Sequence, residues 1–532
     1  MATQTTPGKP DASLAKGGSV KSGSDKVSIS TITMTIMIIT TIVSLRGLAS
    51  QAEFGISSIF YYTFAAVVFL IPFSLVCAEL ASTFTHSGGL FRWVSEAFGP
   101  RWGWAAMYLE WQTVVIWFPS VLMFASVSLA YIFWPEAFDA KLASNKLYTI
   151  IVLLAVYWFA TLNTFRGMKS ANTLSTVGGF CGTIIPGAIL IVLGIIYLIM
   201  GKPLQLSPDQ HFFPDFTQFG TLVLAASIFL FYGGMEMQGV HIQAMKNPAK
   251  DFPKAILMAT VAILVIFIFA TLAISFVVPQ KDINLLQTLF VAYKDLWATL
   301  GVPWLGNVMA LLITFGVIGQ VSVIIAGPST GLMAVAKSGY LPRGLQKNNK
   351  NGINVKILLI QAIFVTILTF VLVVLPSVQS AYQIMSQMAT IIYLIMVLII
   401  FAACIRLRYT QPNKKRGFKI PGGNLGIWIV TIIGMGGALL ALFLSFIPPS
   451  QISTGSPMTY VIILVAGCVL FVALPFWVYK IRKPNWRDPK TDFYPFDWQI
   501  EGRKPEQVSK WPADYTPTET QVESAIQKNN NE

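Results

Sequence analysis

Charged residues are unusually few in this chain. Asp, Glu, Lys and Arg together make up 11% of its 532 residues, whereas soluble domains carry about 25%. Hydrophobic residues make up 55% of the chain, and its mean hydropathy is +0.65. Apolar runs close to the ~20 residues that a helix needs to cross a bilayer recur along the sequence. The scarcity of charge therefore excludes an ordinary soluble protein and predicts an all-α membrane protein embedded in a lipid bilayer.

Motifs for metal binding and catalysis are also missing. The three histidines form no cluster, and the four cysteines lie far apart within apolar runs, so no metal site is predicted. The sequence contains no Walker A pattern, no zinc-protease helix and no nucleophile elbow. We therefore expect no cofactor, and neither an enzyme nor an ATP-driven pump. Transport driven by solute gradients remains.

The net charge of +14 does not indicate a nucleic-acid partner, because no basic face with stacking aromatics accompanies it. Most Lys and Arg residues lie in one set of alternate short loops, around 92–101, 246–254, 337–356 and 406–419. The richly basic loops should face the cytoplasm. Because an even number of spans is expected, both termini should be cytoplasmic, in a multi-pass protein of the cytoplasmic (inner) membrane.

The apolar runs predict about twelve membrane-spanning helices within a transporter domain at residues 28–481. Residues 1–27 are rich in Gly, Ser, Thr and Lys and are expected to be a disordered cytoplasmic tail. Residues 482–532 form a polar cytoplasmic tail. A short helix is expected at 88–98, and an amphipathic stretch at 283–300. The spans are expected near 29–53, 57–82, 102–134, 147–166, 172–200, 219–245, 252–279, 303–337, 354–376, 380–406, 424–447 and 458–480.

Two of these runs are interrupted at corresponding places in the two halves of the chain. Polar residues or glycines break the first at 44–47 and the sixth at 232–236. Unwinding frees backbone groups, so that a half-helix N-terminus can bind a carboxylate and a half-helix C-terminus an ammonium. Broken helices at matching positions point to a transporter's binding site. The predicted substrate contacts at the breaks are Ser44, Leu45, Arg46, Gly47, Tyr232, Gly233, Gly234 and Glu236.

Few ionisable residues fall inside the spans, and each needs a partner or a wet cavity because a charge at the bilayer centre costs ~2.5 kcal/mol or more. Arg46 and Glu236 either pair in a structural salt bridge or face substrate groups. Glu110 is a candidate for holding a substrate ammonium, the alternative being a gate or a helix contact. Glu79 lies near the inner end of its span and is expected to meet water or a loop cation. Tyr232 and Trp111 are candidate gates, with plain packing as the alternative.

Several segments, which follow one another in the same order along the chain, resemble the amino acid-polyamine-organocation superfamily, and within it the glutamate/GABA antiporter-like group. The resemblance implies two inverted five-helix repeats plus two further helices. It implies exchange of an amino acid for its decarboxylation product, often for acid resistance. The protein is expected to be a monomer or homodimer. In similar antiporters a C-terminal segment plugs the inner vestibule at neutral pH, a role open to residues 482–532. The matching segments include Cys77-Ala78-Glu79-Leu80, Gly89-Leu90-Phe91-Arg92-Trp93, Gly99-Pro100-Arg101-Trp102-Gly103, Phe213-Pro214-Asp215-Phe216, Gly327-Pro328-Ser329 and Ile420-Pro421-Gly422-Gly423.

The first break departs from that group. Similar glutamate/GABA antiporters carry a Tyr-Glu-Tyr-Pro-like break, whereas this chain has Leu45-Arg46-Gly47-Leu48. Because the charge at the expected site is changed, substrate identity does not carry over, and another amino acid with its amine stays open. A uniporter or proton symporter of the same fold is one alternative to an antiporter, and a membrane sensor that binds amino acids without moving them is another.

Overall fold

In the computed structural model, the described residues are 29–84, 89–133, 136–167, 178–206, 211–214, 222–238, 245–450, 453, 455–488 and 496–500. Within these ranges the protein is built of helices, with one isolated bridge between Ile29 and Met245 and no strand. The expected all-α class is confirmed. The predicted tail at 1–27 lies outside the described residues.

Ten helices in the described part of the chain are long and apolar enough to cross a membrane. A bent pair, Thr31–Ile42 with Leu45–Ala52, and a shorter apolar helix at Val223–Met237 add the first and sixth spans. This agrees with the prediction of about twelve spans. The ten are α3–η2–α4 (Ser57–Thr83), α6 (Pro100–Ala130), α8 (Lys146–Thr164), η3–α10 (Phe180–Ile199), α14 (Pro248–Val277), α16 (Leu305–Ile324) with α17 (Gly327–Ala336), α18–α19 (Val355–Val374), α20 (Val378–Thr410), α21 (Gly423–Ser445) and α22 (Pro457–Ile481).

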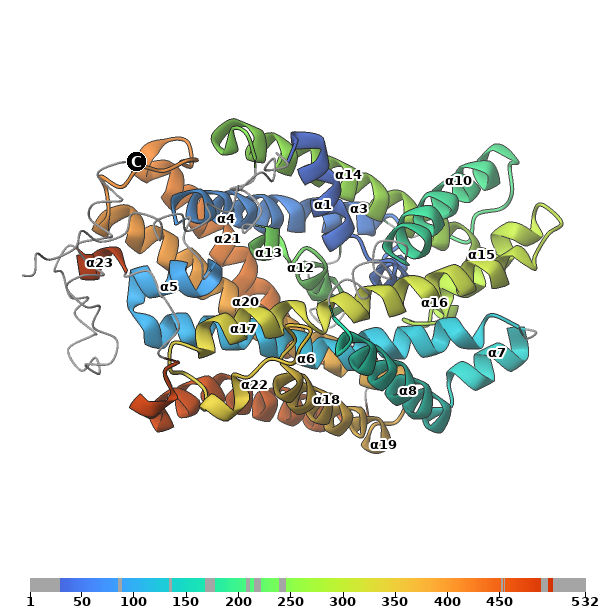
Figure 1. The fold of residues 1–532 in the computed structure, drawn as a ribbon. Coiled ribbons are helices and arrows are strands. Elements are labelled where there is room, and N and C mark those ends of the chain that lie inside the picture. The colour runs from blue at the N-terminus through green and yellow to red at the C-terminus, as the bar shows by residue number, and fades with distance from the viewer. Residues whose placement is uncertain are drawn as a thin grey trace, which may run out of the picture.

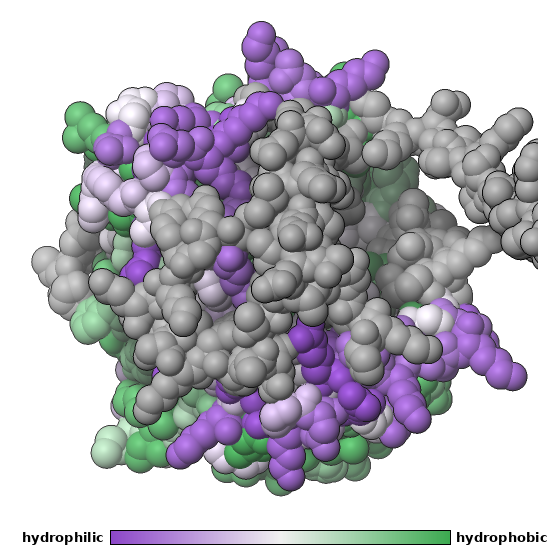
Figure 2. Space-filling view, turned by 60° about the vertical axis from the view of Figure 1, so that its left-hand side comes forward, coloured by the Kyte–Doolittle hydropathy of each residue, from purple (hydrophilic) through white to green (hydrophobic). Residues whose placement is uncertain are grey.

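The long helices run roughly alongside one another, and short helices mark the two ends of the bundle (Figure 1). Helices α5 (Gly89–Phe98) and α23 (Asp497–Ile500) lie at one end, and α7 (Glu136–Ala143) and α15 (Thr288–Ala298) at the other. Figure 2 turns the α5 end toward the viewer, and hydrophilic residues gather over it. We call it the α5 end below. Helix α5 confirms the short helix predicted after the second span, and α15 lies within the predicted amphipathic stretch.

Burial separates the central helices from those at the periphery. The apolar window of α6 is 89% buried and that of α20 is 72% buried, whereas the window of α22 is 17% buried. Helices α6 and α20 pack against each other and form the centre of the bundle. Large apolar side chains such as Val469 and Leu470 of α22 are exposed, as suits a helix that faces lipid.

The first span is interrupted where the sequence predicts. Helix α1 (Thr31–Ile42) ends before an extended Val43 and Ser44, and a 3₁₀ turn, η1 (Leu45–Gly47), leads into α2 (Leu48–Ala52). The two halves are bent by 43°. The backbone at Gly47 lies so close to the Phe231 ring that a Cβ would come within 2.2 Å of it. A side chain at this position would displace the Phe231 ring, so glycine allows the first and sixth spans to pack closely.

The sixth span is interrupted at its glycine pair. The 3₁₀ turn η4 (Val223–Ala226) and α12 (Ser227–Phe231) precede the break, and α13 (Met235–Gln238) follows it. Gly234 has a φ of 108°, which residues with a Cβ rarely adopt. The glycine pair thus makes the interruption possible. The broken spans are the first and the sixth, the places that two five-helix repeats give to their first members.

The described parts of the predicted C-terminal tail pack against the bundle. Phe496, Asp497 and Trp498 are buried, and the Asp497 N–H donates to Glu96 of α5 over 3.0 Å. Asp497 also pairs with Lys414 of the loop after α20. At least this short segment of the tail is therefore part of the folded α5 end.

Candidate substrate-binding site

Arg46 lies at the break of the first span and is 3% exposed. Its Nη1 donates to Ser120 Oγ of α6 over 2.7 Å. Its Cζ lies 5.3 Å from the ring centroid of Trp117, 5.7 Å from that of Phe231 and 5.9 Å from that of Tyr382. Among the described residues it makes no ion pair, and its Nε has no hydrogen-bond partner. A buried cation is thus held by one hydroxyl and three aromatic rings.

Tyr393 of α20 occupies the break of the sixth span. The Gly234 N–H donates to its hydroxyl over 3.2 Å, and the hydroxyl in turn donates to Glu236 Oε2 over 3.1 Å. A Cβ at Gly233 would lie 2.8 Å from Cζ of the same tyrosine. One hydroxyl therefore satisfies a backbone donor freed by the unwinding and orients the carboxylate.

Glu110 adds a second buried carboxyl group to this region. It lies on α6 and is 9% exposed, while Glu236 is 5% exposed. The two carboxyls lie within electrostatic range of each other. Neither pairs with Arg46, so the structural salt bridge between Arg46 and Glu236 is not formed in this structure.

The two breaks lie next to each other. Besides the contact between Gly47 and Phe231, Gln51 Nε2 donates to Leu224 O over 3.0 Å and to Ser227 Oγ over 3.1 Å. These bonds join α2, the second half of the first span, to the start of the sixth. The structure thus brings together the two broken segments that the sequence paired.

The remaining predicted site residues are packed side chains. Tyr232 is fully buried, and its hydroxyl donates to Tyr62 O over 3.0 Å. Trp111 Nε1 donates to Gln361 Oε1 over 2.9 Å. Leu45 is buried and Ser44 is half-buried in the extended segment. The gate roles of Tyr232 and Trp111 stay predictions.

Four residues that complete this region are not among the predicted site residues. Phe231 lies one position before the predicted break, and Ser120 lies in the third span. Tyr382 and Tyr393 lie in α20, eleven positions apart. A usable signal was present in that helix, because hydroxyl side chains recur at 382, 386, 390 and 393, with Gln383 and Gln387 beside two of them. This is the spacing of one helical face.

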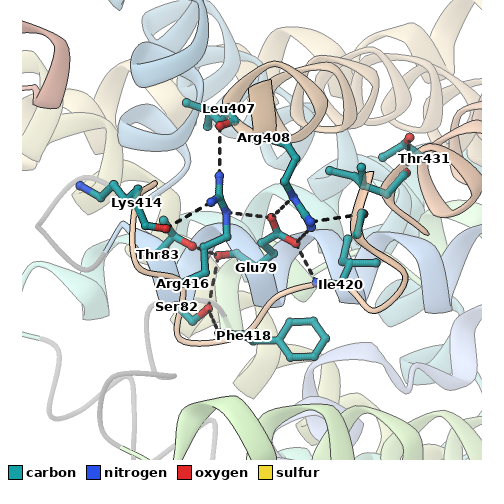
Figure 3. A network of polar contacts seen from close by, with 12 residues as sticks. Glu79, Ser82, Thr83, Leu407, Arg408, Lys414, Arg416, Phe418, Ile420 and Thr431 are labelled. Carbon is teal, nitrogen blue, oxygen red and sulfur yellow. Dashed lines mark hydrogen bonds and ion pairs between the residues drawn. The ribbon is translucent and has the colours of Figure 1, made fainter. Parts of the chain in front are cut away.

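A separate polar network lies toward the α5 end (Figure 3). Glu79 of α4 accepts from Arg408 Nε of α20 over 2.9 Å and pairs with Arg416 Nε over 3.1 Å. It also accepts from the Ile420 N–H over 2.8 Å, and Ser82 Oγ accepts from the Phe418 N–H over 2.8 Å. We call Glu79, Arg408 and Arg416 the arginine clamp. The prediction that Glu79 meets a loop cation is confirmed, because Arg416 belongs to the loop between α20 and α21.

These features define a class of protein. About twelve spans, with interruptions in the first and the sixth beside buried charges, form the architecture of a secondary transporter. The sequence profile of the amino acid permease family matches residues 29–468, and the chain belongs to that family. It is a multi-pass membrane protein that transports amino acids, and it is not an enzyme.

Similar proteins agree with this assignment. The chain is 37% identical over 437 residues to an uncharacterized transporter of Legionella pneumophila, covering 82% of this chain and 93% of the relative. It is 32% identical over 435 residues to the glutamate/gamma-aminobutyrate antiporter of Lactococcus lactis, covering 81% and 86%. It is 22% identical over 458 residues to the probable agmatine/putrescine antiporter of that species, covering 86% and 95%.

Proposed function

We propose that this protein is an antiporter that exchanges an amino acid bearing an acidic side chain for the amine formed by its decarboxylation, by alternating access. The observation that carries the proposal is the buried Arg46 at the first break, which has no carboxylate partner among the described residues. A buried charge is costly unless it is paired. The carboxylate of a substrate would supply the missing partner.

The chemistry of exchange explains why an arginine is suitable at this place. An amino acid and its decarboxylation product differ by the α-carboxylate, so a site that serves both must bind a group that both keep. For an acidic amino acid, the side-chain carboxylate survives α-decarboxylation. Guanidinium binds carboxylate in a planar, charge-assisted arrangement. Arg46 would therefore bind the carboxylate that the two exchanged molecules share.

The acidic pair would serve the other end of the substrate. Both exchanged molecules carry an ammonium group, and Glu110 and Glu236 are buried carboxyls beside the second break. A carboxylate that faces an ammonium in a site of low dielectric gains a strong attraction. The proposed site thus has a cationic group at the first break and anionic groups at the second.

Charge distribution supports an orientation. The α5 end carries the basic loops around 337–356 and 406–419 (Figure 1), and cytoplasmic loops are the ones rich in Lys and Arg. We place this end in the cytoplasm, both termini with it, and the protein in the cytoplasmic membrane.

Counterflow in liposomes tests the exchange. Purified protein is reconstituted, and uptake of labelled L-glutamate is followed with and without γ-aminobutyrate inside the vesicles. We expect uptake that requires the internal amine. Uptake without it, with or without a proton gradient, would indicate a uniporter or symporter. Binding without any uptake would indicate a sensor.

The role of Arg46 has its own test. We expect Arg46→Ala to weaken amino-acid binding at least tenfold, since a charged hydrogen bond contributes about 1.5–3 kcal/mol. Stability in detergent should change little, because no carboxylate of the described residues loses its partner. Unchanged affinity with a large loss of stability would show that Arg46 is structural.

A further inference from the structure

The group that surrounds Arg46 has the composition of a cation-binding cage. Trp117 comes from α6, Phe231 from α12 and Tyr382 from α20, and all three ring centroids lie within 5.9 Å of the guanidinium carbon. Rings at such distances attract cations, and cages of this kind recognise ammonium ligands in other proteins. Here a side chain of the protein itself fills the cage.

The cage depends on more than the arginine. The Phe231 ring lies against the backbone of Gly47, where a Cβ would come within 2.2 Å. Trp117 and Ser120 lie one turn apart on α6, so the ring and the hydroxyl face the guanidinium together. Three separate spans thus contribute to a place for one positive charge.

We propose that Arg46 is a tethered cation that sets the sign of charge the transporter accepts. By filling the aromatic cage, the guanidinium denies it to an ammonium group of a diamine. It also presents an uncompensated positive charge that attracts a carboxylate. The accepted class would be amino acids and amines that carry a carboxylate, and the rejected class would be dications.

This inference rests on the proposed function and makes a claim beyond it. If Arg46 only contacts substrate, its removal should weaken substrate binding, and the variant should bind no new class of ligand. If it also fills a cation cage, its removal should expose that cage to a free cation. Arg46→Ala should therefore lose one substrate class and gain another.

Ligand-dependent thermal stabilisation of the purified full-length protein tests this, with L-glutamate as the anionic amino acid and putrescine as the diamine. For the native protein we expect stabilisation by glutamate and none by putrescine. For Arg46→Ala we expect the apparent affinity for glutamate to fall, and that for putrescine to rise, by about tenfold or more, since a like charge a few ångströms away is removed. Arg406→Ala is the matched control, because Arg406 lies 5.3 Å from the Phe98 ring at the α5 end. It should behave as the native protein.

Arg46→Gln keeps a long side chain that can donate to Ser120, and so it tests charge without emptying the cage. We expect it also to lose glutamate affinity and to tolerate putrescine better than the native protein. If Arg46→Ala and Arg46→Gln both fold and neither has a higher apparent affinity for putrescine than the native protein, the proposal that Arg46 is a tethered cation is wrong. Native protein that binds putrescine as well as glutamate would overturn it too. Failure of glutamate exchange in liposomes would instead defeat the proposed function, whatever putrescine does.

Discussion

The substitution Glu79→Gln is expected to be among the most destabilising single changes in the α5 half of the bundle. Glu79 accepts hydrogen bonds from Arg408 and from the Ile420 N–H, and it forms an ion pair with Arg416. The side chains of Glu79 and Arg408 are 3% and 2% exposed, and that of Arg416 is 5% exposed. An amide keeps one acceptor oxygen, but in place of the other it turns an NH₂ group toward guanidinium or backbone N–H groups that can only donate.

The expected loss in the free energy of unfolding follows from the number of charges in the clamp. Removing one partner of a buried pair costs about 3–5 kcal/mol. In this clamp one carboxylate faces two cations, so its loss also leaves two guanidiniums opposed. Repulsion at ~5 Å and an effective dielectric of ~20 amounts to about 3 kcal/mol. Part of that is relieved as Arg416 shifts, because it also donates to the carbonyls of Leu407 and Gln411. We expect a total loss of about 4 kcal/mol.

Denaturation in mixed micelles of increasing SDS content measures the free energy of unfolding. Arg416→Gln should cost less than Glu79→Gln, because Glu79 then keeps Arg408 as its partner. Lys415→Gln is the matched control in the same loop, since Lys415 is exposed, and it should stay within ~0.5 kcal/mol of the native protein. Equal losses for Glu79→Gln and Arg416→Gln, or a loss below ~1 kcal/mol for the former, would refute the assignment of Glu79 as the shared partner.

Three further expectations follow from the site and the α5 end. Tyr393→Phe should lower exchange about tenfold in the counterflow assay with little loss of protein yield, because one hydroxyl bonds both Gly234 in the sixth break and Glu236 of the helix that follows it; an unchanged rate would show the hydroxyl to be dispensable. Gly47→Ala should reduce exchange by a similar factor and lower thermal stability by about 1–3 kcal/mol, because the new methyl group displaces the Phe231 ring; native activity would show that the ring moves freely. Burial raises the pKa of Glu96 from its ordinary 4.5 to about 7, the carboxylate of Asp497 adds to the rise, and Arg92 opposes it. The docked segment 496–500 brings Asp497 beside Glu96, so the docked state binds this proton more tightly and docking should weaken as the pH rises toward about 7. Hydrogen exchange of that segment, corrected for intrinsic rates, measures the effect, and Glu96→Gln should abolish it.

The last expectation differs from the one that the family resemblance gives. A plug that closes at neutral pH would dock more tightly as the pH rises, whereas protonation of Glu96 favours docking at low pH. Segment 496–500 bonds to α5 through the Asp497 N–H, and Asp497 adds a second carboxylate beside Glu96. The pH profile of docking therefore separates an anchoring contact from a neutral-pH plug.

Hydropathy predicted the spans well because the bilayer imposes one length on every crossing helix. The breaks were predictable because glycine pairs and charges at bilayer depth are costly, and Gly47, Gly233 and Gly234 stand where the helices stop. The extended segment at Ser44 was harder to place to the residue, since local propensity does not fix where a helix ends.

The partners of the buried charges were not predictable in the same way. A salt bridge between Arg46 and Glu236 was one prediction, because each is the charged residue at its break. In the structure Ser120 and three rings hold the arginine, while Tyr393 holds the glutamate. Ser120 lies 74 positions from Arg46 and Tyr393 lies 157 positions from Glu236 along the chain, and aromatic residues are so frequent in membrane helices that none of the rings is marked by its type. The helix-face spacing in α20 is the one local pattern that points to any of them, and it points only to Tyr382 and Tyr393.

Helix α20 has 33 residues, so at 1.5 Å per residue it is about 50 Å long. Along it, Tyr382 touches the arginine at the first break, Tyr393 holds the second break, and Arg408 enters the arginine clamp. A helix without an internal proline transmits tilt rather than absorbing it. Any rotation that opens the space around Arg46 must therefore either swing the far end of this rod against Glu79 or bend the rod between the two. The strength of the ion pair between Glu79 and Arg408 would then help to set the rate at which the region around Arg46 changes conformation.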